Sequence, residues 1–230
     1  MYFQHSAEIW ADHPDLVAGV VFAAGITGNA SVDHQLAGFT TVAETRLAVS
    51  SEAEFPEILA WRRTFSRMGL KPTQYRCAAE SLLRRYRRER TLPRIHPLID
   101  LCNAISLAFA IPVAVFDLSK ISDGLEVRHA RGDERYLTFS GETEHPEPHE
   151  VIFADTAGQA HARRWTNRQS GQSAVRDATS AVLVVAEAMH GSASTDVPNV
   201  TAVVADEVHR VWSASPSTAV LNKDSPRFEF

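Results

Sequence analysis

The stretch that most constrains the fold is residues 92–121, LPRIHPLIDLCNAISLAFAIPVAVFDLSKI, because its hydrophobic pattern changes once along its length. In the first part, apolar residues recur at the three- and four-residue steps of a helix, which predicts a helix with one apolar side. These residues are Leu98, Leu101, Cys102, Ile105 and Phe109. From Pro112 onward, the segment PVAVFDL is more typical of a strand. We therefore expect a helix followed directly by a strand.

Polar residues interrupt the same stretch at regular steps. Asp100, Asn103 and Ser106 are three residues apart, so they share a second side of the predicted helix. Burying each of them without a partner would cost ~1–3 kcal/mol. They bond backbone groups, face solvent, or line a pocket that the apolar neighbours hold rigid, and we take the pocket as the working hypothesis.

The rest of the chain divides into a helical middle and a strand-rich second half. Helices are predicted at 50–70, 76–90 and 201–212, the first of them opening with a capping box at Ser51 and Glu54. Strands are predicted at 15–26, 124–130, 134–140, 150–155 and 161–167, while the apolar run 179–189 fits either element. A short strand and a loose end are expected at 217–230, and Tyr2–Gln4 are given no role because they resemble a protease-site remnant. Without repeats or linkers, this order predicts a single α+β domain over residues 1–230.

Composition and charge exclude several classes of protein. The chain has 230 residues, a net charge of -5 and two cysteines. No apolar run is long enough to span a membrane, and no signal peptide or CxxC pair is present, so we expect a cytoplasmic protein with free thiols and no membrane partner. Any nucleic-acid contact must come from a local basic patch. The arginines of 84–94 offer such a patch, although a solvated helix face explains them equally well.

Known catalytic and metal-binding motifs are missing. The histidines form no HExxH motif, and the two in HPEPH (145–149) belong to an exposed loop because prolines exclude a helix there. Neither GxSxG nor a phosphate-binding loop occurs. We therefore predict no metal and no cofactor, and no covalent mechanism is recognisable.

The central stretch resembles a segment of the phenylalanyl-tRNA synthetase beta subunit, I-N-x-V-V-D-x-T-N-Y-x-x-L-E-x-G-Q-P-x-H-A-F-D-x-x-K-I. The matching residues are Ile95, Pro97, Asp100, Asn103, Leu107, Pro112, Phe116, Asp117 and Ile121. At the family's distance downstream, residues 150–187 resemble its strand pair, glycine-rich turn and S-x-V-x-D-x-T-x-x-x-L-x-E motif. The matches there are Ser173, Val175, Asp177, Thr179 and Leu183, with Glu187 two residues later than the motif's glutamate. PTQYRCAAESLLRR (72–85) is similar to a turn and helix of free-standing relatives, so the resemblance covers about residues 55–190.

The resembling segment belongs to the B3/4 editing domain, which hydrolyses the ester of tyrosine wrongly attached to the phenylalanine tRNA. The resemblance implies a B3/4-like fold with mixed or antiparallel sheets flanked by helices. It also implies deacylation of mischarged aminoacyl-tRNA in trans, with the aminoacylated 3′ end of tRNA as partner and an aminoacyl-tRNA synthetase as a second candidate partner. Water would attack the activated ester, and positioning with help from the terminal ribose hydroxyl would suffice without a triad.

Several positions depart from the family pattern. The pocket histidine of the synthetase is Ala114 here, and Gly-Gly of free-standing relatives becomes Ala114 and Val115, which predicts a narrower, more apolar wall. The relatives' I-N-P contains His96 in this chain, and their W-N-W-R-Q is Trp165–Gln169. These changes leave the identity of the amino acid and of the tRNA open.

The resemblance suggests roles for particular residues. His96 would orient water, Asn103 would hold the substrate's amino or carbonyl group, and Glu187 would bind its ammonium. The expected substrate-binding residues are Arg76, Glu80, Ala114, Trp165, Asn167, Arg168 and Thr179, and the expected tRNA-binding residues are Arg84, Arg85, Arg87 and Arg88. Each has a structural alternative, such as an ion pair between Arg76 and Glu80.

Two functions of other classes stay open beside the hydrolase: a non-catalytic module that binds tRNA or a synthetase, and a binder of small amino acids. All three require the central stretch and the turn that contains Trp165 to converge on one small cavity.

Overall fold

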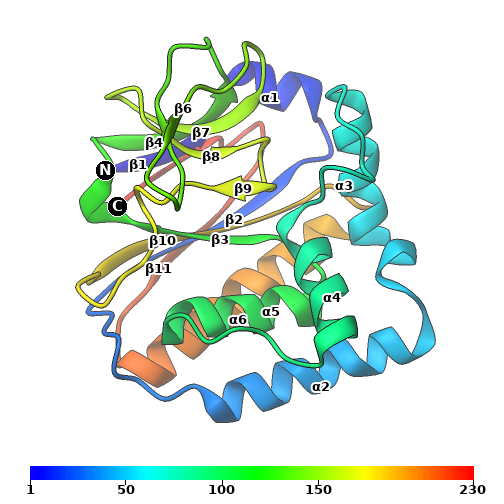
Figure 1. Ribbon diagram of the computed structural model, residues 1–230. Coiled ribbons are helices and arrows are strands. Elements are labelled where there is room, and N and C mark those ends of the chain that lie inside the picture. Colours follow the sequence, from blue (N-terminus) through cyan, green and yellow to red (C-terminus); the bar gives the residue numbers. More distant parts are fainter.

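Two β-sheets face each other in the computed structural model, which describes residues 1–230 (Figure 1). The strands are β1 (Tyr2–His5), β2 (Val17–Ala24), β3 (Val113–Asp117), β4 (Gly124–His129), β5 (Tyr136–Leu137), β6 (Thr143–Glu144), β7 (Val151–Asp155), β8 (Ala160–Arg163), β9 (Arg168–Gln169), β10 (Ala181–Ala188), β11 (Ser217–Leu221) and β12 (Arg227–Glu229). The larger sheet has the order β12–β1–β4–β7–β8–β9, and the smaller has the order β11–β2–β10–β3. Only β1 and β4 pair in parallel. The expected mixed and antiparallel sheets are confirmed.

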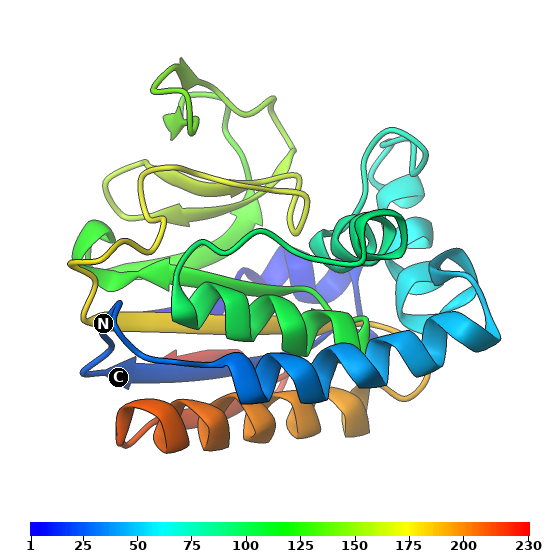
Figure 2. The same cartoon turned by 60° about the horizontal axis from the view of Figure 1, so that its bottom comes forward.

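Helices cover the outer face of the smaller sheet and close one end of the two sheets. They are α1 (Ala7–Asp12), α2 (Asp33–Val49), α3 (Pro56–Arg67), α4 (Ala78–Glu89), α5 (Pro97–Phe109) and α6 (Ala193–Trp212), with 3₁₀ turns η1 (Glu52–Glu54) and η2 (Leu118–Lys120). Figure 2 shows α5 and α6 beneath the smaller sheet, with α2 packed on α5. The α+β class is thereby confirmed, as are the helices predicted from 76–90 and from the central stretch.

The core occupies both faces of the smaller sheet. In β10, Val182 and Val184 pack toward the helices, whereas Leu183 and Val185 pack toward the larger sheet. This follows from the strand geometry, in which successive side chains point to opposite faces. A strand buried on both faces has a continuous apolar sequence, which explains why residues 179–189 fitted either element.

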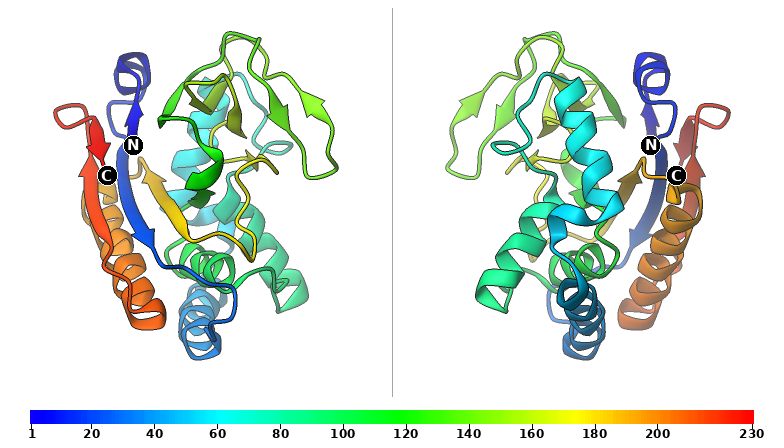
Figure 3. Two further views of the ribbon diagram at one scale, coloured as in Figure 1. Left: turned by 90° about the vertical axis from the view of Figure 1, so that its left-hand side faces the viewer. Right: turned by 90° about the vertical axis from the view of Figure 1, so that its right-hand side faces the viewer.

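Three local predictions were wrong or incomplete. The capping box of Ser51 and Glu54 caps η1, and α3 begins separately at Pro56, a residue suited to the first helical position. Tyr2–Gln4, given no role from the sequence, form β1 together with His5, between β12 and β4. The expected loose end contains β12, and Figure 3 shows the two termini side by side. These strands are too short to show a period, and only their long-range pairing defines them.

Candidate active site

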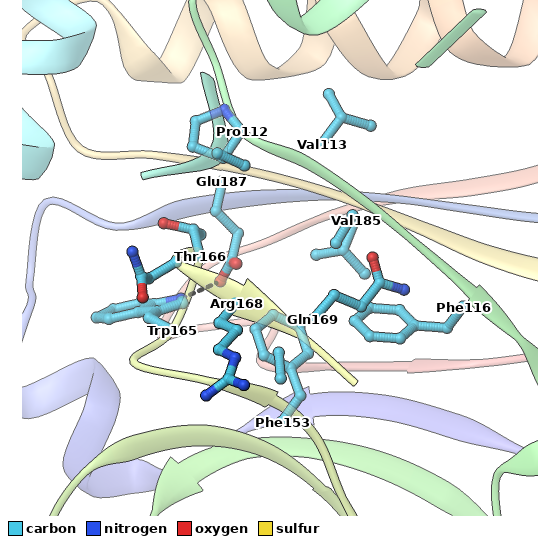
Figure 4. A pocket seen from close by; sticks show the side chains of 14 residues that line it. Pro112, Val113, Phe116, Phe153, Trp165, Thr166, Arg168, Gln169, Val185 and Glu187 are labelled. Carbon is cyan, nitrogen blue, oxygen red and sulfur yellow. Dashed lines mark hydrogen bonds between the residues drawn. The ribbon is translucent and has the colours of Figure 1, made fainter. Parts of the chain in front are cut away.

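A cavity of about 450 Å³, a volume that includes space open to solvent, lies between the two sheets beside the turn that joins β8 to β9 (Figure 4). Its lining residues are Ala78, Pro112, Val113, Ala114, Phe116, Phe153, Ala162, Trp165, Thr166, Asn167, Arg168, Gln169, Val185 and Glu187. The end of the central stretch and the tryptophan-bearing turn therefore converge on one cavity, as expected.

Small side chains among large ones create the hollow. Ala114 and Ala162 are on strands of opposite sheets, and the rings of Phe116 and Phe153, with centroids 5.3 Å apart, bound the apolar end. The prediction that Val115 narrows this wall was wrong. Val115 belongs to the core cluster on the helix side of β3, because neighbouring residues of a strand face opposite sides. Ala114 alone takes the wall position.

Glu187 is the only charged side chain buried in the cavity, since its exposed fraction is 2% and the other charged lining residue, Arg168, is exposed. Its Oε1 accepts a hydrogen bond from Trp165 Nε1 at 3.0 Å and lies 2.6 Å from His5 Nε2. No protein atom donates to Oε2. In Figure 4 the carboxylate points from β10 toward the Trp165 ring. Two donors thus fix the carboxylate and leave one oxygen for a ligand.

The turn between β8 and β9 is strained where it presents Trp165. Arg164 and Trp165 both have left-handed backbone angles, with φ of 47° and 56°. Such angles are uncommon for residues other than glycine and cost of order 1–3 kcal/mol each. Tertiary contacts hold the conformation, because the Trp165 ring packs edge-to-face on Trp61 and His13 with centroid distances of 5.2 and 4.8 Å. This backbone conformation directs the indole N–H of Trp165 toward the Glu187 carboxylate.

Four polar residues after Trp165 form the cavity rim. Asn167 Nδ2 donates to Arg76 O at 2.7 Å, and Gln169 Nε2 donates to Val115 O at 2.6 Å, so both amide oxygens lack a protein partner. The Thr166 hydroxyl is buried and unpaired. Arg168 pairs with Glu144 at 2.9 Å on the exposed side. The rim therefore offers hydrogen-bond donors and acceptors next to an apolar hollow.

Of the ten residues expected to be catalytic or to bind the substrate, five line this cavity and five do not. Ala114, Trp165, Asn167, Arg168 and Glu187 are brought together, whereas Arg76, Glu80, His96, Asn103 and Thr179 lie outside it. His96, Asn103 and Glu187 therefore do not form one catalytic cluster.

The residues outside the cavity have identifiable contacts. His96 Nδ1 caps α5 by accepting from Leu98 N at 3.2 Å, and burial lowers its pKa despite the nearby Asp177 and Asp100. Asn103 lines a separate hollow between α2, α4 and α5. Thr179 Oγ1 donates to Asp117 Oδ2 at 2.7 Å.

The other polar residues of the central stretch also bond within the protein. Asp100 Oδ1 accepts from Ile95 N at 2.8 Å, and Ser106 Oγ donates to Ile111 O at 2.6 Å. Backbone bracing, one of the three open explanations, is thus what Asp100 and Ser106 provide. The polar steps do not line the cavity between the sheets, as the working hypothesis required, although Asp100 lines the separate hollow together with Asn103.

The arginines of α4 are largely paired with carboxylates. Arg84 and Arg87 lie 3.2 and 2.8 Å from the oxygens of buried Glu52. Arg85 and Arg88 lie 2.7 and 2.6 Å from Glu89. These four arginines face an open groove without apolar lining residues. Their carboxylate partners reduce the positive potential of the groove, which stays accessible to solvent.

No serine, cysteine or lysine lines the cavity, and the Thr166 hydroxyl has no base within hydrogen-bonding distance to activate it. Ser173 Oγ lies 2.9 Å from His161 Nδ1, and His161 Nε2 lies 3.3 Å from Asp155, but Ser173 and His161 are fully buried. These three side chains have the composition of a catalytic triad, but no substrate can reach the Ser173 hydroxyl because it is buried. Burial raises the pKa of the Cys77 and Cys102 thiols to about 12, so neither is a thiolate at neutral pH. No group of three metal-ligating side chains occurs.

Sequence reasoning missed His5, Phe153 and Val185 at this site. His5 escaped because its strand was given no role, although it makes the shortest contact to Glu187. Phe153 lies on the strand predicted at 150–155, but the pattern did not say which face of that strand points inward. Val185 lies in the apolar run 179–189, which fitted either a strand or a helix.

Comparisons with known proteins indicate the family of the chain. The family model of the B3/4 domain matches residues 60–206, more than half of the chain. The phenylalanine–tRNA ligase beta subunit of Coxiella burnetii is 43% identical over 53 residues, which cover 23% of this chain and 7% of that protein. The corresponding subunit of Chromobacterium violaceum is 38% identical over 74 residues, 32% of this chain and 9% of that protein. The matched part is thus less than a tenth of those relatives' length.

Among solved structures, an N-terminal fragment of the phenylalanyl-tRNA synthetase beta subunit from Pyrococcus horikoshii is similar with a TM-score of 0.48 and 10% identity. The match covers 93% of this chain and 49% of that one. None of the helices combines the length and apolar character needed to cross a membrane. On the family match over residues 60–206, the chain belongs to the B3/4 domain family.

Proposed function

We propose that this protein hydrolyses the ester of mischarged aminoacyl-tRNA in trans, with the amino-acid side chain in the cavity between the sheets. The observation that carries the proposal is the Glu187 carboxylate, fixed by His5 and Trp165 with Oε2 unpaired, in an otherwise apolar hollow. The family's relation to phenylalanyl-tRNA synthetase supports the choice of an aminoacyl ester.

The cavity suits the parts of an aminoacyl ester. Phe116, Phe153 and Val185 would enclose the apolar portion of the side chain, which gains roughly 25 cal/mol for each Å² removed from water. Glu187 Oε2 would accept a hydrogen bond from a polar group of the amino acid, either its ammonium or a hydroxyl. Such a charge-assisted bond contributes ~1.5–3 kcal/mol.

The chemical step needs no nucleophile from the protein. Water adds to the ester carbonyl carbon, the bond to the ribose oxygen breaks, and that oxygen takes a proton from the attacking water. The rim residues Thr166, Asn167 and Gln169 provide unpaired groups that would orient the ester and the water. Because an aminoacyl ester is already activated, positioning supplies much of the rate.

The test is to incubate the protein with a panel of aminoacyl-tRNAs and to follow the release of free amino acid. Release of one or a few amino acids above the uncatalysed rate is expected. Retardation of tRNA without release would instead indicate a non-catalytic module, and binding of free amino acids alone would indicate an amino-acid binder. A Glu187→Gln variant is the matched control for contaminating hydrolases, because it should lose the release while staying folded.

A further inference from the structure

The hairpin formed by β5 and β6 presents an aromatic side chain to solvent. Phe139 is 66% exposed and is the only phenylalanine or tryptophan among the exposed residues of the chain. Figure 2 shows this hairpin projecting beyond the larger sheet. A single exposed apolar side chain needs no explanation by itself, so its neighbours decide whether it has a role.

The position of Phe139 is fixed relative to the cavity. Gly171 N donates to Leu137 O at 2.9 Å, and Tyr136 Oη donates to Gln169 O at 2.7 Å, which ties the hairpin to the segment after β9. The two segments touch so closely that a Cβ on Gly171 would lie 2.9 Å from the Thr138 carbonyl oxygen. Since Gln169 lines the cavity, the hairpin is anchored directly at the cavity rim.

A cation without a carboxylate partner accompanies the ring. The Arg176 guanidinium lies 5.9 Å from the centroid of Phe139, and Arg176 is exposed and makes no salt bridge. Asp177, its neighbour in the sequence, does not pair with it, and Glu142, in the same hairpin as Phe139, accepts from Ser140. An exposed ring beside an arginine is the combination on which single-stranded nucleic acids stack their bases.

From this arrangement we propose that Phe139 and Arg176 form a stacking platform for an unpaired nucleotide of a tRNA 3′ end. The ring would stack on a base that precedes the aminoacylated adenosine, and Arg176 would contact the base or its phosphate. The identity of the ligand rests on the proposed function, because the adjacent cavity would hold the amino acid. The contact is independent of sequence, since every base has a flat face.

The test uses an RNA hairpin with a single-stranded 3′ tail that contains 2-aminopurine and ends in an amide-linked amino acid, which cannot be hydrolysed. Binding to the full chain is followed by fluorescence anisotropy, and stacking by quenching of the 2-aminopurine. Phe139→Ala should weaken binding about 5- to 100-fold and abolish the quenching. Phe139→Trp should retain both. Ile95→Ala is the matched control, because Ile95 is similarly exposed, at 62%, and does not line the cavity.

The outcomes separate this proposal from the proposed function. Wild-type affinity and quenching in Phe139→Ala would overturn the platform even if ester hydrolysis is found. If the wild-type protein quenches the 2-aminopurine and Phe139→Ala does not, the platform is supported, even when no ester is hydrolysed. Only the proposed hydrolase activity would then be refuted. Absence of RNA binding by the wild-type protein would overturn the platform, as would a Phe139→Ala effect confined to binding of another protein.

Discussion

Two buried glutamates, both expected at the site, differ in how their charge is compensated. Glu80 lies between α3 and α4 with an exposed fraction of 0%, and Arg62 binds both of its oxygens at 2.6 and 3.1 Å, while Arg76 lies 3.3 Å away. Glu187 faces the cavity, contacts no arginine, and keeps Oε2 unpaired. Burial of a carboxylate therefore does not identify a site. The difference lies in whether the protein uses all of its hydrogen-bonding capacity.

If Glu80 is structural, removing its main partner should cost stability. We expect Arg62→Met to lower the free energy of unfolding by ~3 kcal/mol, since a fully buried carboxylate keeps only Arg76. Urea denaturation measures the change. The double variant Arg62→Met/Glu80→Leu should recover most of the loss, because an apolar pair replaces the ion pair. An Arg62→Met protein as stable as the wild type would remove the contrast between the two glutamates.

Glu187 should show the opposite pattern, with a large effect on activity and a small one on folding. We expect Glu187→Gln to lower kcat/KM for an aminoacyl ester by ~100-fold, because an amide N–H replaces the oxygen that faces the ligand. Oε1 remains to accept from Trp165, so the free energy of unfolding should change by less than ~1 kcal/mol.

Glu80→Gln is the matched control for Glu187→Gln. It should reduce stability and leave kcat/KM within about a factor of three at a temperature where the variant is folded. Equal effects of the two substitutions on kcat/KM would mean that Glu187 acts through the fold alone.

Ala114, on the strand next to that of Glu187, should determine which side chain fits. We expect Ala114→Leu to lower kcat/KM about tenfold for the largest amino acid accepted, with a smaller loss for small ones, since one or two apolar contacts decide such preferences by ~1–3 kcal/mol. Competition between two aminoacyl esters measures the ratio. Ala114→Gly is the reciprocal variant, and a ratio that moves in the same direction in both would place the side chain elsewhere.

The sequence predicted α4, α5 and the tryptophan-bearing turn at the cavity's rim, because these carry strong local signals. The apolar spacing of residues 98–109 and the turn motif at 165–169 led to α5 and to the tryptophan-bearing turn. The sequence does not define β1 or α2, since one is too short for a period and the apolar residues of the other are not confined to one side. His5 was lost with β1.

The same limit applies to the polar residues. Spacing placed Asp100, Asn103 and Ser106 on one side of a helix, but it does not show which backbone groups the tertiary fold brings within hydrogen-bonding distance of them. Ser106 bonds the carbonyl of Ile111, beyond the end of its own helix, and Glu80 meets an arginine from another helix. Whether a buried polar group is satisfied depends on tertiary neighbours, so sequence alone does not separate bracing from binding.

Acid should weaken the cavity region through His13, whose ring packs on Trp165. Burial, followed by repulsion from Arg67, lowers the pKa of His13 from 6.5 to about 4. Between these values the unfolded chain binds a proton that the folded chain resists, so this contribution to stability is complete above pH 6.5 and is lost as the pH falls toward 4. His13→Phe keeps a ring without a titrating group. Its Tm should fall ~2–4 °C less than that of the wild type between pH 7 and pH 5.

The smallest effect is expected from the arginines on the helical side, where carboxylates already compensate much of the charge. Arg85→Ala with Arg88→Ala should weaken binding of the RNA hairpin less than tenfold and should reduce the slope of log affinity against log salt by at most about 2. Arg84 and Arg87 are poor choices for this test, because each pairs with buried Glu52 and the loss of either arginine would disturb the fold.

Arg176→Ala, which removes a cation without a carboxylate partner, should weaken binding more than the double variant does. If the double variant binds RNA more weakly than Arg176→Ala does, RNA contacts the α4 arginines despite their carboxylate partners. In that case, pairing with a carboxylate does not tell which surface arginines bind RNA, unlike the buried glutamates, where it separates Glu80 from Glu187.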